Sequence, residues 1–98
     1  MTDKPIIMTV LFEARPGKEA ELRKALTDVL APTRKEDGCI FYDLHVAAGD
    51  PSKLLFHESW ASDDHHKAHD LTPHIQALRA RVSELSLPPV KTWWEKIG

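Results

Sequence analysis

Four short apolar runs along the chain predict four β-strands. They span residues 5–14, 39–47, 53–61 and 90–97, with Gly or Pro beside each of them. Runs rich in β-branched and aromatic residues between such breakers are typical of strands. The first two runs are apolar on both faces, whereas a sheet exposed on one side would alternate apolar with polar residues. Both faces of the sheet are therefore expected to be covered.

The segment between the first two strands, residues 18–38, predicts an amphipathic helix. Leu22 and Leu26 recur at helical spacing, and acidic residues fill the first turn, where the helix dipole favours them. Pro32 is expected to kink this helix or end its regular part, because proline cannot donate to the helical ladder. The charged side chains of the segment, Glu36 among them, are expected to form a solvated surface.

Between the third and fourth strands the helical pattern is split in two. Ser62 is a suitable N-cap for a short helix that ends at His69 or Asp70. Thr72-Pro73 then starts a longer helix, which continues to the Pro88-Pro89 pair.

This order of elements, with a hairpin turn at residues 49–51, predicts an α+β fold of the ferredoxin-like split βαβ type. In that plan a four-stranded antiparallel sheet carries the helices on one face. The other face still presents apolar residues from every strand, and such a patch normally marks an interface. We therefore expect a homodimer whose two sheets pack face to face, since two-fold symmetry is the commonest way to cover such a patch.

Composition and charge narrow the class of protein. The length predicts a single domain over residues 1–98, and 42% hydrophobic with 29% charged residues is ordinary for a globular chain. The formal net charge is -2 and the basic residues are scattered, so a nucleic-acid partner is not expected. No apolar run reaches the ~20 residues of a membrane span, and the N-terminal residues do not resemble a secretory signal. We expect a cytoplasmic protein with no membrane contact.

Several stretches of the chain together resemble one known family. The segments EARPGKEAELRKAL, TRKEDGCIFYDLHV, HESWAS and AHDLTPHIQAL are similar to the antibiotic biosynthesis monooxygenase domain, and to the small quinol monooxygenases within it. The most specific matching positions are residues 38–42, Glu58, Trp60, His69 and His74. The resemblance covers nearly the whole chain.

The resemblance implies a dimeric α+β barrel with a pocket between sheet and helices in each subunit. It also implies a monooxygenase that oxidises a small phenolic or quinol-type aromatic substrate with molecular oxygen and uses no metal, flavin or other cofactor. Two other functions stay open. One is a non-catalytic or stress-related dimer that holds a small apolar molecule, and the other is haem degradation, as in relatives of the same fold. Those relatives use a strand asparagine, and this chain contains no asparagine.

Four of the six histidines lie within residues 65–74, which makes this region the best candidate for chemistry. Imidazole titrates at about pH 6.5, so it can accept a proton near working pH. His69 is the first candidate for the base that removes a phenolic proton. His74, at a helix start whose amides favour an anionic oxygen, is the second. Either imidazole could instead only hold the helix junction together.

Glu58 is the third candidate catalytic residue, because strand alternation sets it between Phe56 and Trp60 on a face expected to be buried. A buried carboxylate needs a partner. It could orient one of the histidines, act as an acid with a raised pKa, or form a salt bridge to Arg34 or Arg79.

Trp60, Tyr42 and Phe56 are the candidate substrate-binding residues. The indole of Trp60 offers an aromatic face and an N–H donor, although Trp60 could equally be a core residue and Tyr42 a sheet residue that faces the dimer. His65 and His69 stand four residues apart, but a stable metal site needs three or four ligands, so no metal site is expected.

Three other residues complete the expectations. Cys39, the only cysteine, is expected to be a small buried hydrophobe and can form no intrachain disulfide. Trp93 and Trp94 should lie on opposite faces of the last strand, one packed under the helices and the other in the dimer interface.

Overall fold

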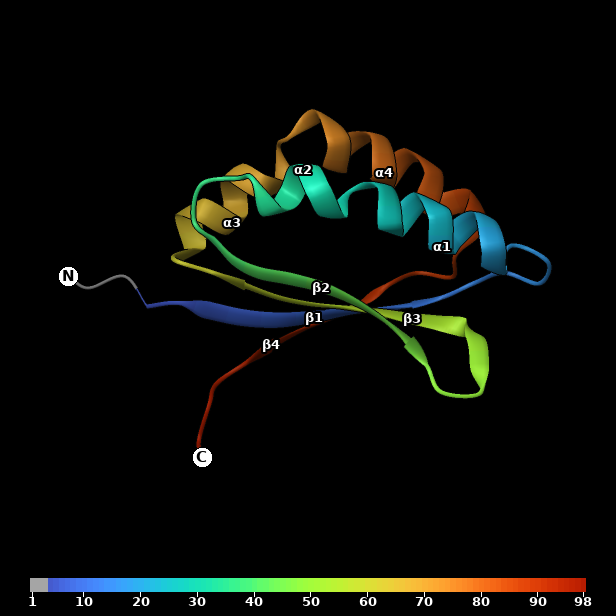
Figure 1. Cartoon of the computed structure of the whole chain (residues 1–98), viewed down its shortest axis with the longest axis horizontal. Helices are drawn as coiled ribbons and strands as arrows, with labels where there is room; N and C mark the ends of the chain where they lie inside the picture. The colour runs from blue at the N-terminus through green and yellow to red at the C-terminus, as the bar shows by residue number, and fades with distance from the viewer. Residues whose placement is uncertain (1–3) are drawn as a thin grey trace.

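The computed structural model describes residues 4–98 and confirms the α+β ferredoxin-like fold. Its elements are β1 (Ile6–Glu13), α1 (Glu19–Asp28), α2 (Leu30–Arg34), β2 (Cys39–Ala47), β3 (Asp50–Trp60), α3 (Asp63–Asp70), α4 (Pro73–Leu85) and β4 (Val90–Trp94). The helices all cover one face of the sheet, which we call the inner face, and no described helix covers the outer face (Figure 1).

The sheet is antiparallel with strand order β2-β3-β1-β4. Met8 on β1 pairs with Glu58 on β3 and with Trp93 on β4, while Glu58 also pairs with Tyr42 on β2. Directly paired residues share a face of a sheet. Side chains from all four strands therefore form one row across the inner face.

The interruption expected from Pro32 is confirmed, but it lies one turn before the proline. Helix α1 ends at Asp28, and α2 begins at Leu30. A proline ring clashes with the carbonyl four residues earlier, which here belongs to Asp28. The regular helix therefore ends at that carbonyl rather than at the ring itself.

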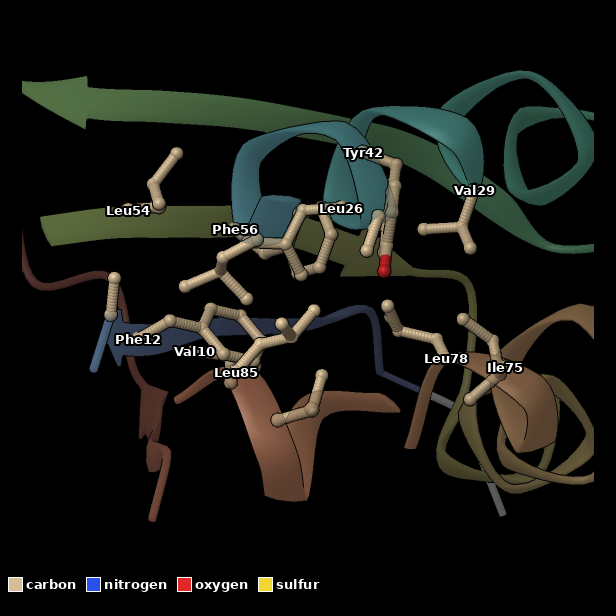
Figure 2. Packing of buried hydrophobic residues seen from close by; sticks show 14 of the residues in the cluster. Val10, Phe12, Leu26, Val29, Tyr42, Leu54, Phe56, Ile75, Leu78 and Leu85 are labelled. Atoms are coloured by element: carbon tan, nitrogen blue, oxygen red, sulfur yellow. The ribbon is translucent and has the colours of Figure 1, made fainter. Parts of the chain in front are cut away.

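The hydrophobic core lies between the inner face and the helices. Val10, Phe12 and Phe56 point from the strands toward Leu26 and Leu78 on α1 and α4 (Figure 2). The rings of Phe12 and Phe56 meet edge to face with centroids 5.5 Å apart, a favoured aromatic geometry. This packing ties both central strands to the helices and gives the inner face a rigid floor.

The last strand differs from its prediction in one respect. Trp93 and Trp94 do lie on opposite faces, since they pair with Met8 and Ile7, respectively. The prediction that one tryptophan packs under the helices is wrong, because the inner one, Trp93, is 56% exposed. Strand β4 is an edge strand, and the His66 ring of α3 lies 6.5 Å from the Trp93 ring without covering it. Trp94 is 54% exposed on the outer face, where its Nε1 donates to Thr9 Oγ1 at 2.9 Å.

Two strand ends also differ from the boundaries predicted from the sequence. Strand β3 begins at Asp50 rather than residue 53, and β4 ends at Trp94 rather than residue 97. Gly49, with φ of +80°, reverses the chain so tightly that the strand resumes at once. Pro51 is tolerated near the start of a strand.

No helix among residues 4–98 is both long and apolar enough to cross a membrane. The cytoplasmic location stays a prediction.

Candidate active site

A pocket of about 420 Å³ lies between the inner face of the sheet and helices α3 and α4. Its floor is formed by Met8, Val10, Phe12, Tyr42, Phe56 and Glu58, and its helical wall by His66, His69, Asp70, Ile75, Leu78, Arg79, Val82 and Ser83. The volume and the mostly apolar lining are those of a small-molecule site. His66 and His69 line the pocket from α3, with Glu58 3.9 Å from His66, while the cationic lining residues Arg15, Arg79 and Lys91 come from other segments. The apolar side chains of the strands and of α4 form the body of the pocket.

His69 is the buried histidine of the pocket. Its ring is 4% exposed and stacks at 4.5 Å from the Trp60 ring, with Tyr42 at 5.5 Å. Burial lowers the pKa of His69 below its ordinary value, while its hydrogen bond to Glu36 acts in the opposite direction. A neutral imidazole at this position has one nitrogen able to accept a proton.

The hydrogen bond to Glu36 determines which nitrogen of His69 can accept a proton. The Oε2 atom of Glu36 lies 2.9 Å from His69 Nδ1 and 2.8 Å from His74 Nε2. A carboxylate oxygen only accepts, so both imidazoles donate to it. Because Nδ1 of His69 carries the proton, Nε2 is the nitrogen with the free lone pair.

The expectation that Glu36 belongs to a solvated surface is therefore wrong. Its side chain is only 13% exposed, whereas the following residue, Asp37, is 99% exposed. Glu36 precedes β2 by three residues and stands among charged neighbours, so its sequence surroundings carry no signal of burial. Its partners are 33 and 38 residues away, and only the folded chain brings them together.

His74, the second candidate base, does not line the pocket. It is 24% exposed at the start of α4 and contacts Glu36. Of the two histidines singled out from the sequence, only His69 faces the cavity. His74 holds the carboxylate from the other side, which matches the alternative of a histidine at the helix junction.

Glu58 lies in the floor of the pocket, buried to 2% exposure. Its Oε1 accepts a hydrogen bond from Trp60 Nε1 at 2.9 Å, and His66 Nε2 is 3.9 Å from the same oxygen. Burial, the largest cause, raises the pKa of Glu58 to about 7. The carboxyl is therefore protonated at slightly acidic pH and can serve as a proton donor.

The other partners considered for Glu58 belong elsewhere. Arg34 donates to the Tyr42 carbonyl and approaches Asp43, while Arg79 pairs with Asp70 at 2.7 Å. The alternative of a salt bridge from Glu58 to either arginine is wrong. The carboxylate that orients His69 is Glu36. Of the roles considered for Glu58, that of an acid with a raised pKa remains.

His66 is a pocket residue that the sequence interpretation missed. It lies on the same α3 face as His69, with ring centroids 5.9 Å apart, and its Nε2 is 3.8 Å from Asp70. Burial lowers the pKa of His66. The spacing of three residues from His69 was the available signal, because such pairs share a helix face.

The three candidate substrate-binding residues separate into two groups. Tyr42 and Phe56 line the pocket, and burial raises the pKa of the Tyr42 hydroxyl, which therefore stays protonated. Trp60 is 0% exposed, does not line the pocket and gives its N–H to Glu58. Its ring instead supports the imidazole of His69.

Among the described residues, Glu36, His69 and His74 are the side chains that could together hold a metal ion. Their three ligand atoms lie within 4.8 Å of one another. The pair considered from sequence spacing is not formed, because His65 bonds Ser62 at 2.7 Å and approaches Asp37 at 3.3 Å.

Comparison with known proteins identifies the family to which this chain is similar. Residues 5–81 match the family model described as antibiotic biosynthesis monooxygenase. A proposed monooxygenase of Mycobacterium tuberculosis is 37% identical over 86 residues, which cover 88% of this chain and 84% of that protein. An uncharacterised Synechocystis protein is 25% identical over 96 residues, and the match spans 98% of this chain but 65% of that protein's length.

Solved structures agree on the fold. The Mycobacterium tuberculosis protein has a structure that matches with a TM-score of 0.89 at 32% identity, over 97% of each chain. A Pseudomonas aeruginosa protein matches with a TM-score of 0.93 at 24% identity, over 100% of this chain and 99% of the other. The second likeness is one of fold alone.

Proposed function

Because this chain belongs to the antibiotic biosynthesis monooxygenase family, we propose that it oxidises a phenolic or quinol-type aromatic substrate with molecular oxygen. The proposed reaction needs no metal or flavin, since an electron-rich phenolate can itself supply electrons to oxygen. What the protein must provide is a base, a proton donor and a closed apolar chamber.

The observation that carries the proposal is the Glu36–His69 pair at the wall of an apolar pocket. The 2.9 Å hydrogen bond leaves His69 Nε2 as the proton acceptor. It also lets the carboxylate stabilise the imidazolium that forms after proton transfer, as a carboxylate does in other histidine-based sites. Trp60, stacked on the ring at 4.5 Å, limits its rotation.

The reaction balances with these groups. His69 takes the hydroxyl proton of the substrate, and the resulting anion gives its electrons to O₂ as a carbon–oxygen bond forms. The O–O bond then breaks. One oxygen atom stays on the substrate, and the other leaves as water with the two hydrogens that the substrate lost. Glu58, whose pKa is about 7, lines the same pocket and is proposed to donate a proton to the departing oxygen.

The substrate ring is proposed to lie in the apolar body of the pocket. Tyr42 and Phe56 form part of the floor, with Leu78 and Val82 opposite them on α4. These side chains exclude water, which strengthens the interaction between the substrate anion and nearby polar groups. A volume of about 420 Å³ suits one or a few fused rings.

We also propose that the protein works as a homodimer through the outer face. Leu11, Val90 and Trp94 expose 41%, 58% and 54% of their surface there, on adjacent strands. The outer face carries these side chains on β1 and β4 where no described helix covers them. A second copy offers the matching apolar surface, as an isologous interface requires.

The proposal is tested with purified protein and a quinol of the menadiol type, or anthrone, under air. Wild type should accelerate conversion of anthrone to anthraquinone, or of the quinol to its hydroxyquinone, with one O₂ consumed and one water released per product. His69→Ala should lower kcat by about 10²–10⁴-fold, the usual contribution of a general base. His65→Ala is the matched control, since it removes an imidazole from the same helix but outside the pocket.

An unchanged rate in His69→Ala would refute the assignment of the base. If wild type binds these aromatic compounds tightly in a thermal-shift assay but turns none of them over, the chain is a small-molecule-binding protein instead. A Soret shift on adding haem, lost in His69→Ala, would favour the haem-degrading alternative.

A further inference from the structure

We propose that Glu36, His69 and His74 form a binding site for one divalent transition-metal ion of the Zn²⁺ class. The site lies behind the Nδ1 side of His69, away from the nitrogen that serves the pocket. We further propose that metal binding switches off the base, a consequence that rests on the proposed function. The metal is thus an inhibitor of the reaction and not its cofactor.

The donor set fits such an ion. Two imidazole nitrogens and one carboxylate oxygen converge, all within 4.8 Å of one another, with the oxygen 2.8 and 2.9 Å from the nitrogens. Zn²⁺ prefers these donors, and three protein ligands plus water is a common tetrahedral arrangement. Bonds of ~2.0–2.1 Å require donors about 3.3 Å apart. The side chains therefore need to move by only a fraction of an ångström to a little over one.

The fold holds these ligands firmly and from separate segments. Glu36 comes from the connection between α2 and β2, His69 from α3 and His74 from the start of α4. His69 is 4% exposed and Glu36 13% exposed, so both are held by packing before any ion arrives. A preformed site loses little ordering entropy on binding.

An ion can reach the site without crossing the substrate pocket. A separate cleft of about 340 Å³ is lined by Glu36 and Thr72, together with Asp37, Asp64 and His65. Thr72 lies 3.4 Å from His74 Nε2, so the cleft borders two parts of the site. Its carboxylates raise the local concentration of cations. The side chain of His74 is 24% exposed, so it is also in contact with solvent.

Binding changes what His69 offers to the substrate. Without metal, Nδ1 carries the proton and donates to Glu36, which leaves a lone pair on Nε2. A metal on Nδ1 displaces that proton, and the neutral ring then carries its hydrogen on Nε2. The nitrogen that accepted a proton becomes a donor. The same three residues thus have a metal-free form with a base and a metal-bound form without one.

The binding half of the proposal is tested by titrating metal-free protein with Co²⁺, whose visible absorption reports its coordination. We expect one ion per chain, displaced by Zn²⁺. Glu36→Gln and His74→Ala should each weaken Co²⁺ binding by about 100-fold or more, since loss of a direct ligand costs at least as much as the 10–100-fold of an outer partner. Asp64→Asn removes the same charge from the cleft and should bind within about threefold of wild type.

Absence of Co²⁺ binding at millimolar concentration, or unchanged binding in Glu36→Gln, would overturn the site. Circular dichroism of each variant confirms that a loss of binding is not a loss of fold. A weakening in Asp64→Asn equal to that in Glu36→Gln would assign the ion to the cleft instead and would also overturn the proposal.

The switch is tested by Zn²⁺ inhibition of quinol oxidation. Wild type should lose activity with a midpoint equal to the Zn²⁺ dissociation constant and regain it with EDTA, while the activity left in His74→Ala should be insensitive to Zn²⁺ in that range. If wild type binds Co²⁺ as expected but oxidises nothing, the proposed function fails and the metal site stands. If it oxidises substrate with the metal bound, the switch fails and the proposed function stands.

Discussion

The indole nitrogen of Trp60 donates a hydrogen bond to Glu58 across 2.9 Å, two residues apart on the same face of β3. Both side chains are buried, at 0% and 2% exposure. One neutral donor does not replace the hydration that a carboxylate loses on burial. The pKa of Glu58 is therefore raised to about 7, and the carboxyl keeps its proton below that pH.

The free energy of unfolding should consequently fall as the pH rises from about 4.5 to about 7. The pKa of Glu58 is about 7 in the folded chain against a reference of 4.5, so between these values the folded state holds a proton that the unfolded state has lost. Wild type should lose up to about 3 kcal/mol of unfolding free energy from this group between about pH 4.5 and 7, with no further loss above that.

Glu58→Gln should abolish that dependence, because glutamine keeps an acceptor for Trp60 and cannot ionise. Urea unfolding of both proteins at pH 5 and pH 8 measures the difference, and Glu84→Gln, on the exposed side of α4, corrects for a lost carboxylate. A variant whose stability relative to wild type is equal at both pH values would contradict a raised pKa for Glu58.

Glu36→Gln should lower kcat by about 10- to 100-fold with little change in KM. The amide can still accept from Nδ1 of His69, but it no longer offers a negative charge to the imidazolium, so part of the contribution of the base is lost. Steady-state kinetics with the same quinol measures this effect. Asp64→Asn, a loss of charge outside the pocket, should retain wild-type kcat, and an equal loss there would mean a general electrostatic effect.

Val82→Phe should raise KM by about tenfold or more while changing stability by less than ~1.5 kcal/mol. Val82 lines the pocket, so the larger side chain can occupy cavity space at the expense of substrate. Val29→Phe is the contrasting variant, because Val29 is buried at 5% exposure away from the pocket and should cost about 1–3 kcal/mol by overpacking. Equal destabilisation by the two variants would argue against an open chamber.

Gly38→Ala should destabilise the protein more than Gly49→Ala or Gly17→Ala. All three glycines have φ of +80°, which costs a side chain about 1–2 kcal/mol. Only at Gly38 would the added Cβ also clash with another residue, the ring of His65, whereas nothing lies within 4 Å at the other two glycines. Thermal unfolding of the three variants separates the clash from the backbone strain, and three equal shifts would exclude the close contact.

Leu11→Asp should convert the proposed dimer to monomers. A carboxylate in the middle of the outer face would lie opposite its symmetry mate or apolar side chains, and burying it unpaired is costly. Light scattering coupled to size-exclusion chromatography measures the mass. Leu71→Asp, at a 74% exposed position between α3 and α4, should leave the dimer intact. A monomeric wild type would remove this part of the proposal.

Some features of the site were predictable from local sequence. Strand alternation gave the buried face of Glu58, and its raised pKa follows from a carboxylate between two large aromatic residues. The cluster of histidines at residues 65–74 predicted His69 as a site residue, and His69 does line the pocket. His66 was within reach of the same argument, because its helical spacing from His69 puts both on one face.

The sequence by itself determined the order of strands and helices, the fold class and which residues of a strand share a face. These features depend on local periodicity, which repeats every two residues in a strand and about every 3.6 in a helix. The tertiary structure alone decided that Glu36 is the partner of His69 and His74, that Trp60 gives its N–H to Glu58, and that Trp93 stays half exposed on an edge strand. Contacts between residues tens of positions apart depend on how the helices lie on the sheet, and no local pattern encodes that geometry.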